Sequence, residues 1–204
     1  QQVVDKTNMP VFILMDVPNQ PLFSNLREDA LIVYTLKQAL KTRKMDWLLL
    51  YPMTKSVISA MDVIQDYYLK KYKIKISKFV ITGASKRGWT TWLSAYADKR
   101  VHAILPMVYD NLNLKAQMKN QVHMWGNFSY KISDYSDNQL PGLLKTKIGA
   151  YIGALIDPYS YREYLKLPKI IILGTNDHYW PINALNLYYN NLKGSSYIVY
   201  VPNN

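Results

Sequence analysis

The sequence predicts an α/β protein with a mostly parallel sheet and helices on both of its faces. Short apolar runs alternate along the chain with segments whose apolar residues recur at helical spacing, which is the pattern of strands joined by crossover helices. With 204 residues, 49% of them hydrophobic, the chain is long enough for one compact domain. We therefore expect a single domain over residues 1–204, with strands at residues 10–15, 79–82, 101–107, 169–173 and 196–201.

The first part of the chain contains one predicted strand and two predicted helices. The run PVFILM at residues 10–15 suits a buried strand, and the proline-containing DVPNQPLF that follows suits a loop. Residues 27–44 have apolar residues at helical spacing, with acidic residues early and basic residues late, as the helix dipole prefers. A second helix is predicted over residues 53–72, with an inward face formed by Val57, Ile58, Met61, Val63, Ile64 and Tyr67.

Residues 78–97, KFVITGASKRGWTTWLSAYA, predict a strand, a very tight turn that carries Ser85, and a helix. This is the local shape of a nucleophile elbow, in which an attacking serine stands clear of the backbone between a strand and a helix. Gly83 and Ala84 are the small neighbours that such close packing needs. The usual G-x-S-x-G pattern is incomplete, because Arg87 occupies the place of the second glycine and Gly88 follows one residue later.

Two other interpretations of this turn are open. Ser85 is also a suitable N-cap for the helix that follows, which is a purely structural role. The letters TGASK also open the phosphate-binding turn of short-chain dehydrogenases, where glycines admit a cofactor pyrophosphate to a helix N-terminus. That fingerprint requires two more glycines, at the positions of Arg87 and Trp89. The nucleophile is therefore the favoured interpretation, and we predict no cofactor.

The second half of the chain continues the alternation around one irregular region. Residues 109–142 lack clear periodicity and are rich in Asn, Gln, Lys, Met and aromatic residues, which is typical of an insertion or lid over an active site. A surface excursion with one or two short helices would give the same pattern. Further helices are predicted at residues 144–156 and 182–192, with a tyrosine-rich turn region at 157–167 between them.

Three polar residues follow predicted strands at the edge of the sheet where α/β enzymes hold their chemistry. These are Ser85, Asp110 and Asp177. An α/β-hydrolase takes its catalytic triad in the order Ser, acid, His, and the acid orients the histidine that accepts the serine proton. Asp177 is the predicted acid and Asp110 the reserve candidate. An Asx turn with Asn176 is the structural alternative for Asp177.

The histidine of this pattern is not found among the three in the chain. His178 is adjacent to Asp177, so their side chains diverge, His102 begins a strand, and His123 lies in the irregular region. A base is expected in the loop after the last strand, and the chain reaches Asn204 in that loop.

The composition excludes several classes of site. The formal net charge is +11 with a pI of about 9.6, which favours contact with anionic surfaces. The basic residues are scattered and no nucleic-acid-binding motif accompanies them, so we predict no nucleic-acid partner.

The chain has no cysteine, which excludes disulfides and thiolate metal sites, and no metal site is predicted. No apolar run is long enough to span a membrane, and the first residues have no signal-peptide pattern.

Eight segments of the sequence resemble the corresponding motifs of the PhoPQ-activated pathogenicity-related protein family. They are VPNQPL at 17–22, REDA at 27–30, TGASKRGWTTWL at 82–93, KAQMK at 115–119, DPYSYR at 157–162, GTND at 174–177, ALNLY at 184–188 and YVPN at 200–203. The resemblance covers nearly the whole chain from residue 10 onward. It implies an α/β-hydrolase-like, usually exported bacterial protein, linked to virulence regulation, without a well-defined substrate.

The resemblance implies roles for three residues of this chain. Ser85 would be the nucleophile, Asp177 the acid, and the N–H of Lys86 one of two oxyanion donors. It also implies a partial α/β-hydrolase fold whose first strands lie upstream with the second donor, and a Gly-His after YVPN, just beyond the last residues of this chain, which would supply the base. We therefore expect a periplasmic or secreted serine hydrolase of ester or amide bonds, with a small-molecule or peptide substrate, of which this fragment alone is nearly inactive. A noncatalytic binding protein on the same scaffold is the alternative.

Overall fold

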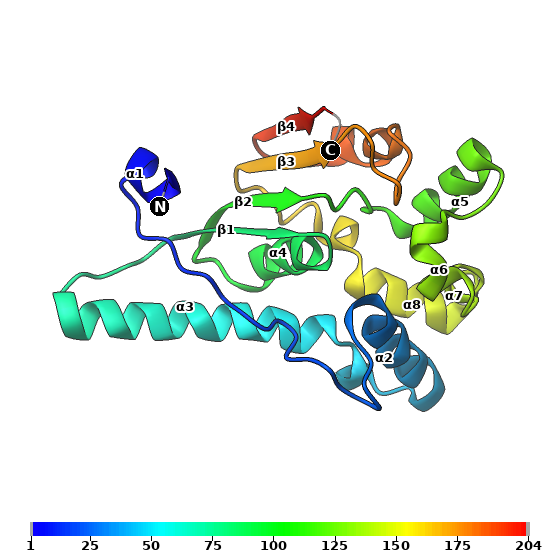
Figure 1. Ribbon diagram of the computed structural model, residues 1–204, viewed down its shortest axis with the longest axis horizontal. Helices are drawn as coiled ribbons and strands as arrows, with labels where there is room; N and C mark the ends of the chain where they lie inside the picture. The colour runs from blue at the N-terminus through cyan, green and yellow to red at the C-terminus, as the bar shows by residue number, and fades with distance from the viewer. Residues whose placement is uncertain (1, 203–204) are drawn as a thin grey trace.

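The computed structural model describes residues 2–202 and contains one sheet (Figure 1). Every neighbouring pair of its strands is parallel, and the strands lie in the order in which they occur along the chain. The α/β class and the last four predicted strands are therefore confirmed. The strands are β1 (Phe79–Ala84), β2 (Val101–Met107), β3 (Lys169–Gly174) and β4 (Ser196–Val201).

Residues 10–15 do not form the strand that was predicted for them. They are extended but unpaired with the sheet, and their apolar side chains are exposed, Ile13 by 80%. The ring of Phe12 meets the edge of the Tyr68 ring, with 5.5 Å between the centroids. An apolar run becomes a strand only where a neighbouring strand accepts its backbone hydrogen bonds, and no strand among residues 2–202 does so.

Helices join the strands and form the rest of the molecule. The helix predicted at residues 27–44 is confirmed as α2, and the one predicted at residues 144–156 is confirmed as α8, which begins three residues later. The α-helices are α1 (Gln2–Thr7), α2 (Glu28–Thr42), α3 (Leu50–Tyr72), α4 (Lys86–Ala97), α5 (Leu114–Trp125), α6 (Ser133–Ser136), α7 (Leu140–Leu143) and α8 (Lys147–Ile156). The 3-10 helices are η1 (Met45–Trp47), η2 (Tyr130–Ile132), η3 (Pro158–Tyr161), η4 (Ala184–Leu187) and η5 (Tyr189–Asn191).

Two helical predictions differ from the structure in detail. Residues 182–192 form η4 and η5 instead of one α-helix, because asparagine side chains compete for backbone hydrogen bonds and weaken helices. The predicted inward face of α3 is correct at Met61 but wrong at Val63, which is 68% exposed, and at Tyr67, which is also exposed. Figure 1 shows why: the second half of α3 extends beyond the rest of the molecule.

The helices cover one face of the sheet. Helix α4 packs across β1 and β2, and α3 packs against α4. Because side chains alternate along a strand, Ile81, Ile104 and Ile171 face these helices, and the last two are fully buried. The opposite face carries exposed side chains such as Tyr197, and no helix of residues 2–202 buries it. The expectation of helices on both faces therefore holds for one face in the described part of the chain.

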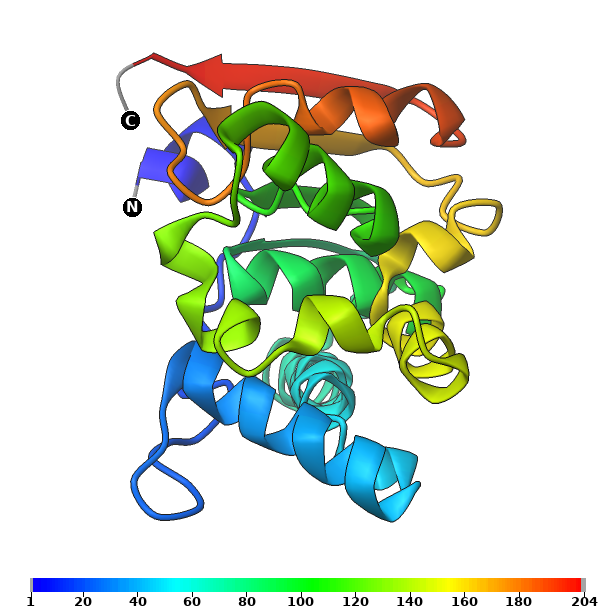
Figure 2. The same ribbon diagram turned by 90° about the vertical axis from the view of Figure 1, so that its right-hand side faces the viewer.

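The irregular region at residues 109–142 forms α5, η2, α6 and α7, and buried amides hold it in place. Gln117 Nε2 donates to the carbonyl oxygen of Ala184 at 3.0 Å, and Gln121 Nε2 donates to that of Tyr179 at 2.7 Å. Figure 2 shows α5, α6 and α7 in front of the edge at which the strands end. This region therefore covers the edge of the sheet that carries Ser85.

Candidate active site at the carboxyl edge of the sheet

Ser85 occupies the turn between β1 and α4 in a strained backbone conformation. Its φ is 54° and its ψ is −124°, a region that residues other than glycine rarely adopt and that is typical of functional sites. The backbone is held there because Ser85 N donates to Met107 O at 2.9 Å and Trp89 N donates to Ser85 O at 3.0 Å. The Ser85 side chain makes no capping hydrogen bond. The N-cap alternative is therefore not the role that the side chain has here.

Two glycines permit the close contact between strand and helix at this turn. A Cβ on Gly83 would lie 2.6 Å from Arg87 O, which is too close for any real side chain. A Cβ on Gly88 would lie 3.0 Å from the Cβ of Tyr109 and 3.1 Å from Met107 O. Gly88 thus makes the second close approach, which explains why the glycine one residue later can complete the pattern.

The long side chain of Arg87 fits at this position because it points away from the turn. Its guanidinium binds Glu28 in bidentate fashion, with N–O distances of 2.8 and 2.9 Å, and its Nε donates to Val17 O at 3.0 Å. Arg87 and, less strongly, Lys86 hold the pKa of the Glu28 carboxyl well below its usual range. The segments VPNQPL, REDA and TGASKRGW therefore meet in one network of hydrogen bonds and ion pairs around the elbow.

Lys86, the first residue of α4, also turns its side chain into this network. Its Nζ lies 2.8 Å from Glu28 Oε2 and 3.4 Å from Asp29 Oδ1, and the Tyr135 hydroxyl donates to the same Asp29 oxygen at 3.2 Å. The N–H of a first helical residue has no acceptor within its helix and lies at the positive end of the helix dipole. The ion pairs therefore fix the side chain within this network, and the backbone N–H lies in the first turn of α4.

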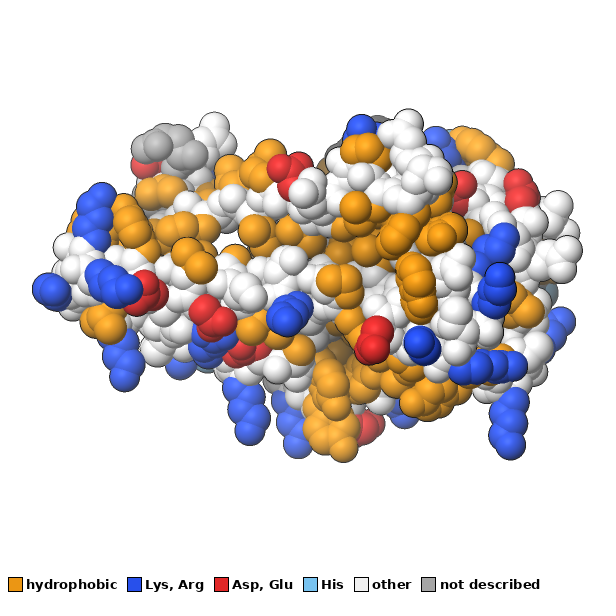
Figure 3. Space-filling model, turned by 90° about the horizontal axis from the view of Figure 1, so that it is seen from below, with side chains coloured by type: hydrophobic (Ala, Val, Ile, Leu, Met, Phe, Trp, Pro, Cys, Tyr) orange, Lys and Arg blue, Asp and Glu red, His pale blue; other side chains and the backbone are white. Residues whose placement is uncertain are grey.

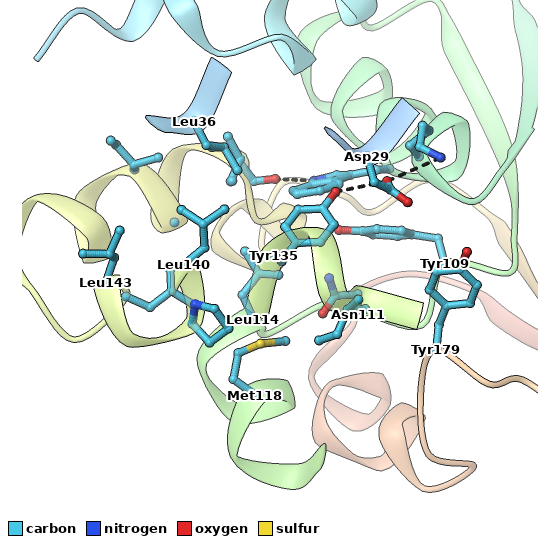
Figure 4. A pocket seen from close by; sticks show the side chains of 18 of the residues that line it. Asp29, Leu36, Tyr109, Asn111, Leu114, Met118, Tyr135, Leu140, Leu143 and Tyr179 are labelled. Atoms are coloured by element: carbon cyan, nitrogen blue, oxygen red, sulfur yellow. Dashed lines mark hydrogen bonds and ion pairs between the residues drawn. The ribbon is translucent and has the colours of Figure 1, made fainter. Parts of the chain in front are cut away.

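Ser85 and Lys86 line a cavity of about 120 Å³, shown in Figure 4. Its walls are mainly apolar and come from α2, α4, α5, α7 and α8. Ser85, Asp29, Lys86, Tyr109, Asn111, Tyr135 and Tyr179 bring polar atoms to it. The apolar lining residues are Leu36, Leu40, Trp89, Val108, Leu114, Met118, Ile132, Leu140, Pro141, Leu143, Leu144, Ile152, Ile156 and Trp180, with Gly149 and Gly153 of α8.

A second strained residue lies beside the first. Val108 directly follows β2 with a φ of 43°, which is exceptional for a β-branched side chain. It is fixed because its N–H donates to Ile172 O at 2.8 Å, and it lines the same cavity as Ser85. Strained residues thus follow two adjacent parallel strands, at one edge of the sheet, and both face one cavity.

Asp177 follows β3 at this edge but lines a different hollow, with Trp125, Asn127, Phe128, Ser129, Tyr130 and His178. Its Oδ1 accepts the N–H of Tyr179 at 2.7 Å, as in the Asx turn that was its structural alternative. Burial raises the pKa of its carboxyl. Among residues 2–202 no hydrogen bond joins Asp177 to Ser85, so the proposed pair shares an edge of the sheet without direct contact.

Asp110, the reserve acid, is more deeply buried than Asp177. It follows β2 and is 4% exposed, and its Oδ1 has no hydrogen-bond partner among the described residues. Burial raises the pKa of this carboxyl to about 7, the nearby Tyr188 hydroxyl opposes that shift, and the charge of Asp177 adds to it. Asp110 and Asp177 are therefore near neighbours across β2 and β3.

The described histidines do not complete a triad. His102 lies on the exposed face of the sheet and His123 on the surface of α5, while the His178 ring lies 6.3 Å from that of Tyr130. None of these three lines the cavity of Ser85. The predicted base, beyond Asn204, lies outside the described residues.

Metal-binding clusters and membrane-spanning helices are both absent from residues 2–202. Residues 2–202 hold no group of three or more His, Asp or Glu side chains arranged to bind a metal ion. None of the helices in that range is long and apolar enough to span a bilayer. Figure 3 shows Lys and Arg side chains spread along the face that it presents, with Asp and Glu between them.

Comparison with known proteins identifies the family of the chain and agrees with the fold described above. Residues 1–204 match the profile of the family described as "PhoPQ-activated pathogenicity-related protein". The chain is 35% identical over 198 residues to the autocrine proliferation repressor protein A of Dictyostelium discoideum, covering 93% of this chain and 40% of that protein. It superposes on the acetyl xylan esterase of Paenibacillus sp. R4 with a TM-score of 0.52 at 15% identity, covering 74% of this chain and 47% of the esterase. The chain thus spans less than half of each protein, and its fold is that of α/β-hydrolases.

Several residues of the site were not singled out by the sequence. Glu28 and Asp29 lie in REDA, a word whose acidic pair was assigned only to a helix start. Tyr109 and Asn111 flank Asp110 in a stretch that has an ordinary turn composition. The one signal that pointed to them was their place directly after a strand that ends at the functional edge.

Proposed function

The chain belongs to the PhoPQ-activated pathogenicity-related protein family, and we propose that it supplies the nucleophile of a serine hydrolase of ester or amide bonds. The observation that carries the proposal is the strained Ser85 turn, which ends a parallel strand, begins a helix and opens into a mainly apolar cavity. A residue at a costly φ persists when the surrounding structure enforces it, and such strain clusters at reactive groups.

In the proposed reaction Ser85 Oγ attacks the carbonyl carbon of the substrate. A histidine outside the described residues accepts the hydroxyl proton and later donates it to the leaving group. The Lys86 N–H donates a hydrogen bond to the developing oxyanion, strengthened by the N-terminal end of the α4 dipole. Water then repeats the attack on the acyl-enzyme and releases Ser85, so the ester or amide bond is hydrolysed.

Asp177 is the proposed acid, with the function of holding that histidine in the right tautomer. It follows β3, two strands from Ser85, in the usual chain order of Ser, acid and base. Because Asp110 lies beside it, Asp110→Asn and Asp177→Asn are to be compared in the same assay. Replacement of the acid by the amide keeps the shape and loses about 10⁴-fold in rate. The larger loss should occur in Asp177→Asn, and a larger loss in Asp110→Asn would transfer the role.

The test of the nucleophile uses an activity probe on the intact protein. A fluorophosphonate should label the wild type and leave Ser85→Ala unlabelled, with a mass shift on the peptide that contains Ser85. Ser56→Ala, which changes an exposed serine of α3, is the matched control and should label like the wild type. Equal labelling of the wild type and Ser85→Ala would refute the assignment.

A noncatalytic binding protein on a hydrolase scaffold is the second candidate. The observation in its favour is that Asp177 and the three described histidines lie away from the cavity of Ser85. Absence of labelling in an intact protein that still binds ligands in this cavity would support it. A saturable NAD(P) titration would support neither candidate.

The cellular setting belongs to the proposal as well. The family resemblance supports export to the periplasm or the medium, with a small molecule or peptide as substrate. The name of the Dictyostelium relative refers to proliferation, and no such role follows for this chain. Separation of cell fractions with an antibody against the intact protein tests export, and retention in the cytosol would refute it.

A further inference from the structure

The cavity beside Ser85 has an apolar end and a polar end. Figure 4 shows Leu140 and Leu143 at one end, and Tyr109, Asn111 and Tyr179 at the other, with Tyr135 between them. A volume of about 120 Å³ compares with the engineered cavity of about 150 Å³ that binds benzene. This volume covers both ends, so the cavity as a whole has room for a group slightly smaller than benzene.

Two polar atoms at the other end are buried without a partner. The hydroxyl of Tyr109 and the Oδ1 of Asn111 form no hydrogen bond with any described residue, and their side chains belong to residues that are 5% and 8% exposed. Buried polar groups in folded proteins are almost always satisfied, and an unsatisfied one is costly. Both residues line the cavity, so a ligand there can supply the two missing partners.

These atoms lie next to the elbow. The Tyr109 ring stacks on Trp89 with 5.3 Å between the centroids and 23° between the planes, and its Cβ packs against Gly88. Trp89 is in turn fixed, because its Nε1 donates to Ile156 O at 2.5 Å. A polar group bound by Tyr109 and Asn111 is thus held beside the first turn of α4, which starts immediately after Ser85.

The two unpaired atoms differ in the partners that they can take. Carboxamide oxygens only accept hydrogen bonds, so Asn111 Oδ1 needs an N–H or O–H from the ligand. Burial raises the pKa of the Tyr109 hydroxyl well above its usual value, so this group keeps its proton and donates. An amide unit offers both an N–H and a carbonyl oxygen, whereas an ester offers no donor.

We propose that the cavity binds acylated amino acids or short peptides, with a small aliphatic side chain of about leucine size in the leucine end and the adjacent amide unit on Tyr109 and Asn111. The scissile carbonyl is then the next one along the substrate, beside Ser85. This assignment rests on the proposed hydrolase function for the attack by Ser85 and on the cavity alone for binding.

The test measures binding to the intact Ser85→Ala protein, which cannot cleave the ligand by the proposed route. The ligands are the methyl esters of N-acetyl-alanine, N-acetyl-leucine and N-acetyl-phenylalanine, followed by the fluorescence of Trp89 and Trp180 in the cavity wall. The leucine ester should bind about tenfold more tightly than the alanine ester, because it buries more apolar surface, and the phenylalanine ester should gain less than the leucine ester because its ring is too large for the cavity. Equal affinities would overturn the assignment of the apolar end.

The amide is tested by replacing one atom of the ligand. In the analogue of N-acetyl-leucine methyl ester, the N–H is replaced by an ester oxygen, and the affinity should fall about tenfold because Asn111 Oδ1 loses its donor. Asn111→Leu should abolish this difference. Asn186→Leu, the same change at an exposed asparagine that does not line the cavity, is the matched control and should preserve it. Equal affinity of the two ligands for the Ser85→Ala protein would overturn the amide assignment without any further variant.

The outcome of the binding test can be separated from the outcome of the labelling test of the proposed hydrolase function. Tight binding of the leucine ester to a protein whose wild type resists fluorophosphonate would refute the hydrolase and retain the ligand class. Labelling of Ser85 together with a lack of saturable binding by all three esters would retain the hydrolase and refute the ligand class.

Discussion

Asp110 makes the stability of this protein depend on pH in a way that Asp110→Asn should remove. The pKa of its carboxyl is about 7 in the folded protein against 3.8 for an ordinary aspartate, mainly because it is buried. Folding therefore takes up a proton between these two values. The stability associated with the protonated carboxyl is complete below pH 3.8, is lost as pH rises, and is fully lost above pH 7.

The size of the effect follows from that difference. About three pKa units at about 1.4 kcal/mol each give a total of about 4 kcal/mol. Between pH 5 and pH 8.5 about two of these units are lost, or about 3 kcal/mol. The amide introduced by Asp110→Asn stays neutral at both pH values. The free energy of unfolding of this variant relative to the wild type should therefore rise by about the same amount from pH 5 to pH 8.5.

The assay is urea denaturation of the intact protein at the two pH values, followed by tryptophan fluorescence. Asp66→Asn, at an exposed aspartate paired with Lys70 at 2.7 Å, is the matched control and should differ from the wild type by under about 1 kcal/mol at both. If the difference between Asp110→Asn and the wild type is the same at pH 5 and pH 8.5, the buried carboxyl is not protonated in the folded state and the reasoning is wrong.

Two other substitutions test the packing and the charge of the elbow. Gly88→Ala should lower the free energy of unfolding by about 1 to 3 kcal/mol, because the added Cβ meets Tyr109 and two backbone oxygens at 3.0 to 3.1 Å. Gly142→Ala, where the new Cβ has no atom within 4 Å, is its control in urea denaturation and should not lose stability. The depressed pKa of Glu28 contributes stability above pH 4.5 that is lost as the pH falls below that value. The Tm of Glu28→Gln should therefore fall less than that of the wild type between pH 5 and pH 3, whereas Glu163→Gln, an exposed change, should follow the wild type.

The elbow was predictable because its structure is set within about twenty consecutive residues. An apolar strand, small residues and a helix with an apolar face are all local properties, and the observed bounds of β2 and β4 agree with the prediction to the residue. The role of Arg87 was not predictable in this way. Its partners, Glu28 and Val17, are 59 and 70 residues distant along the chain, and only the fold brings them together.

The strand expected at residues 10–15 failed for a related reason. Its composition suits a strand, but strand formation also requires a partner with free backbone groups, and none is present in the described part of the chain. The cavity could not be predicted from the sequence for a third reason. Leu36, Leu140 and Ile152 have the spacing of ordinary core residues on three separate helices, and nothing in that spacing distinguishes a filled core from a cavity wall.

Sequence position does not distinguish Asp110 from Asp177 as the catalytic acid, whereas their burial in the folded protein does. Both residues follow a parallel strand, and both lie in stretches with a turn-like composition. Asp177 already uses one oxygen to close its turn and is the more exposed of the two, whereas Asp110 leaves an oxygen unpaired in the interior. Two neighbouring carboxylates in one low-dielectric region resist joint ionisation. Burial raises the pKa of the Asp110 carboxyl to about 7 and raises that of Asp177 as well. The acid partner of a protonated histidine must be ionised, and the more exposed Asp177 loses less hydration than Asp110 when it carries that charge.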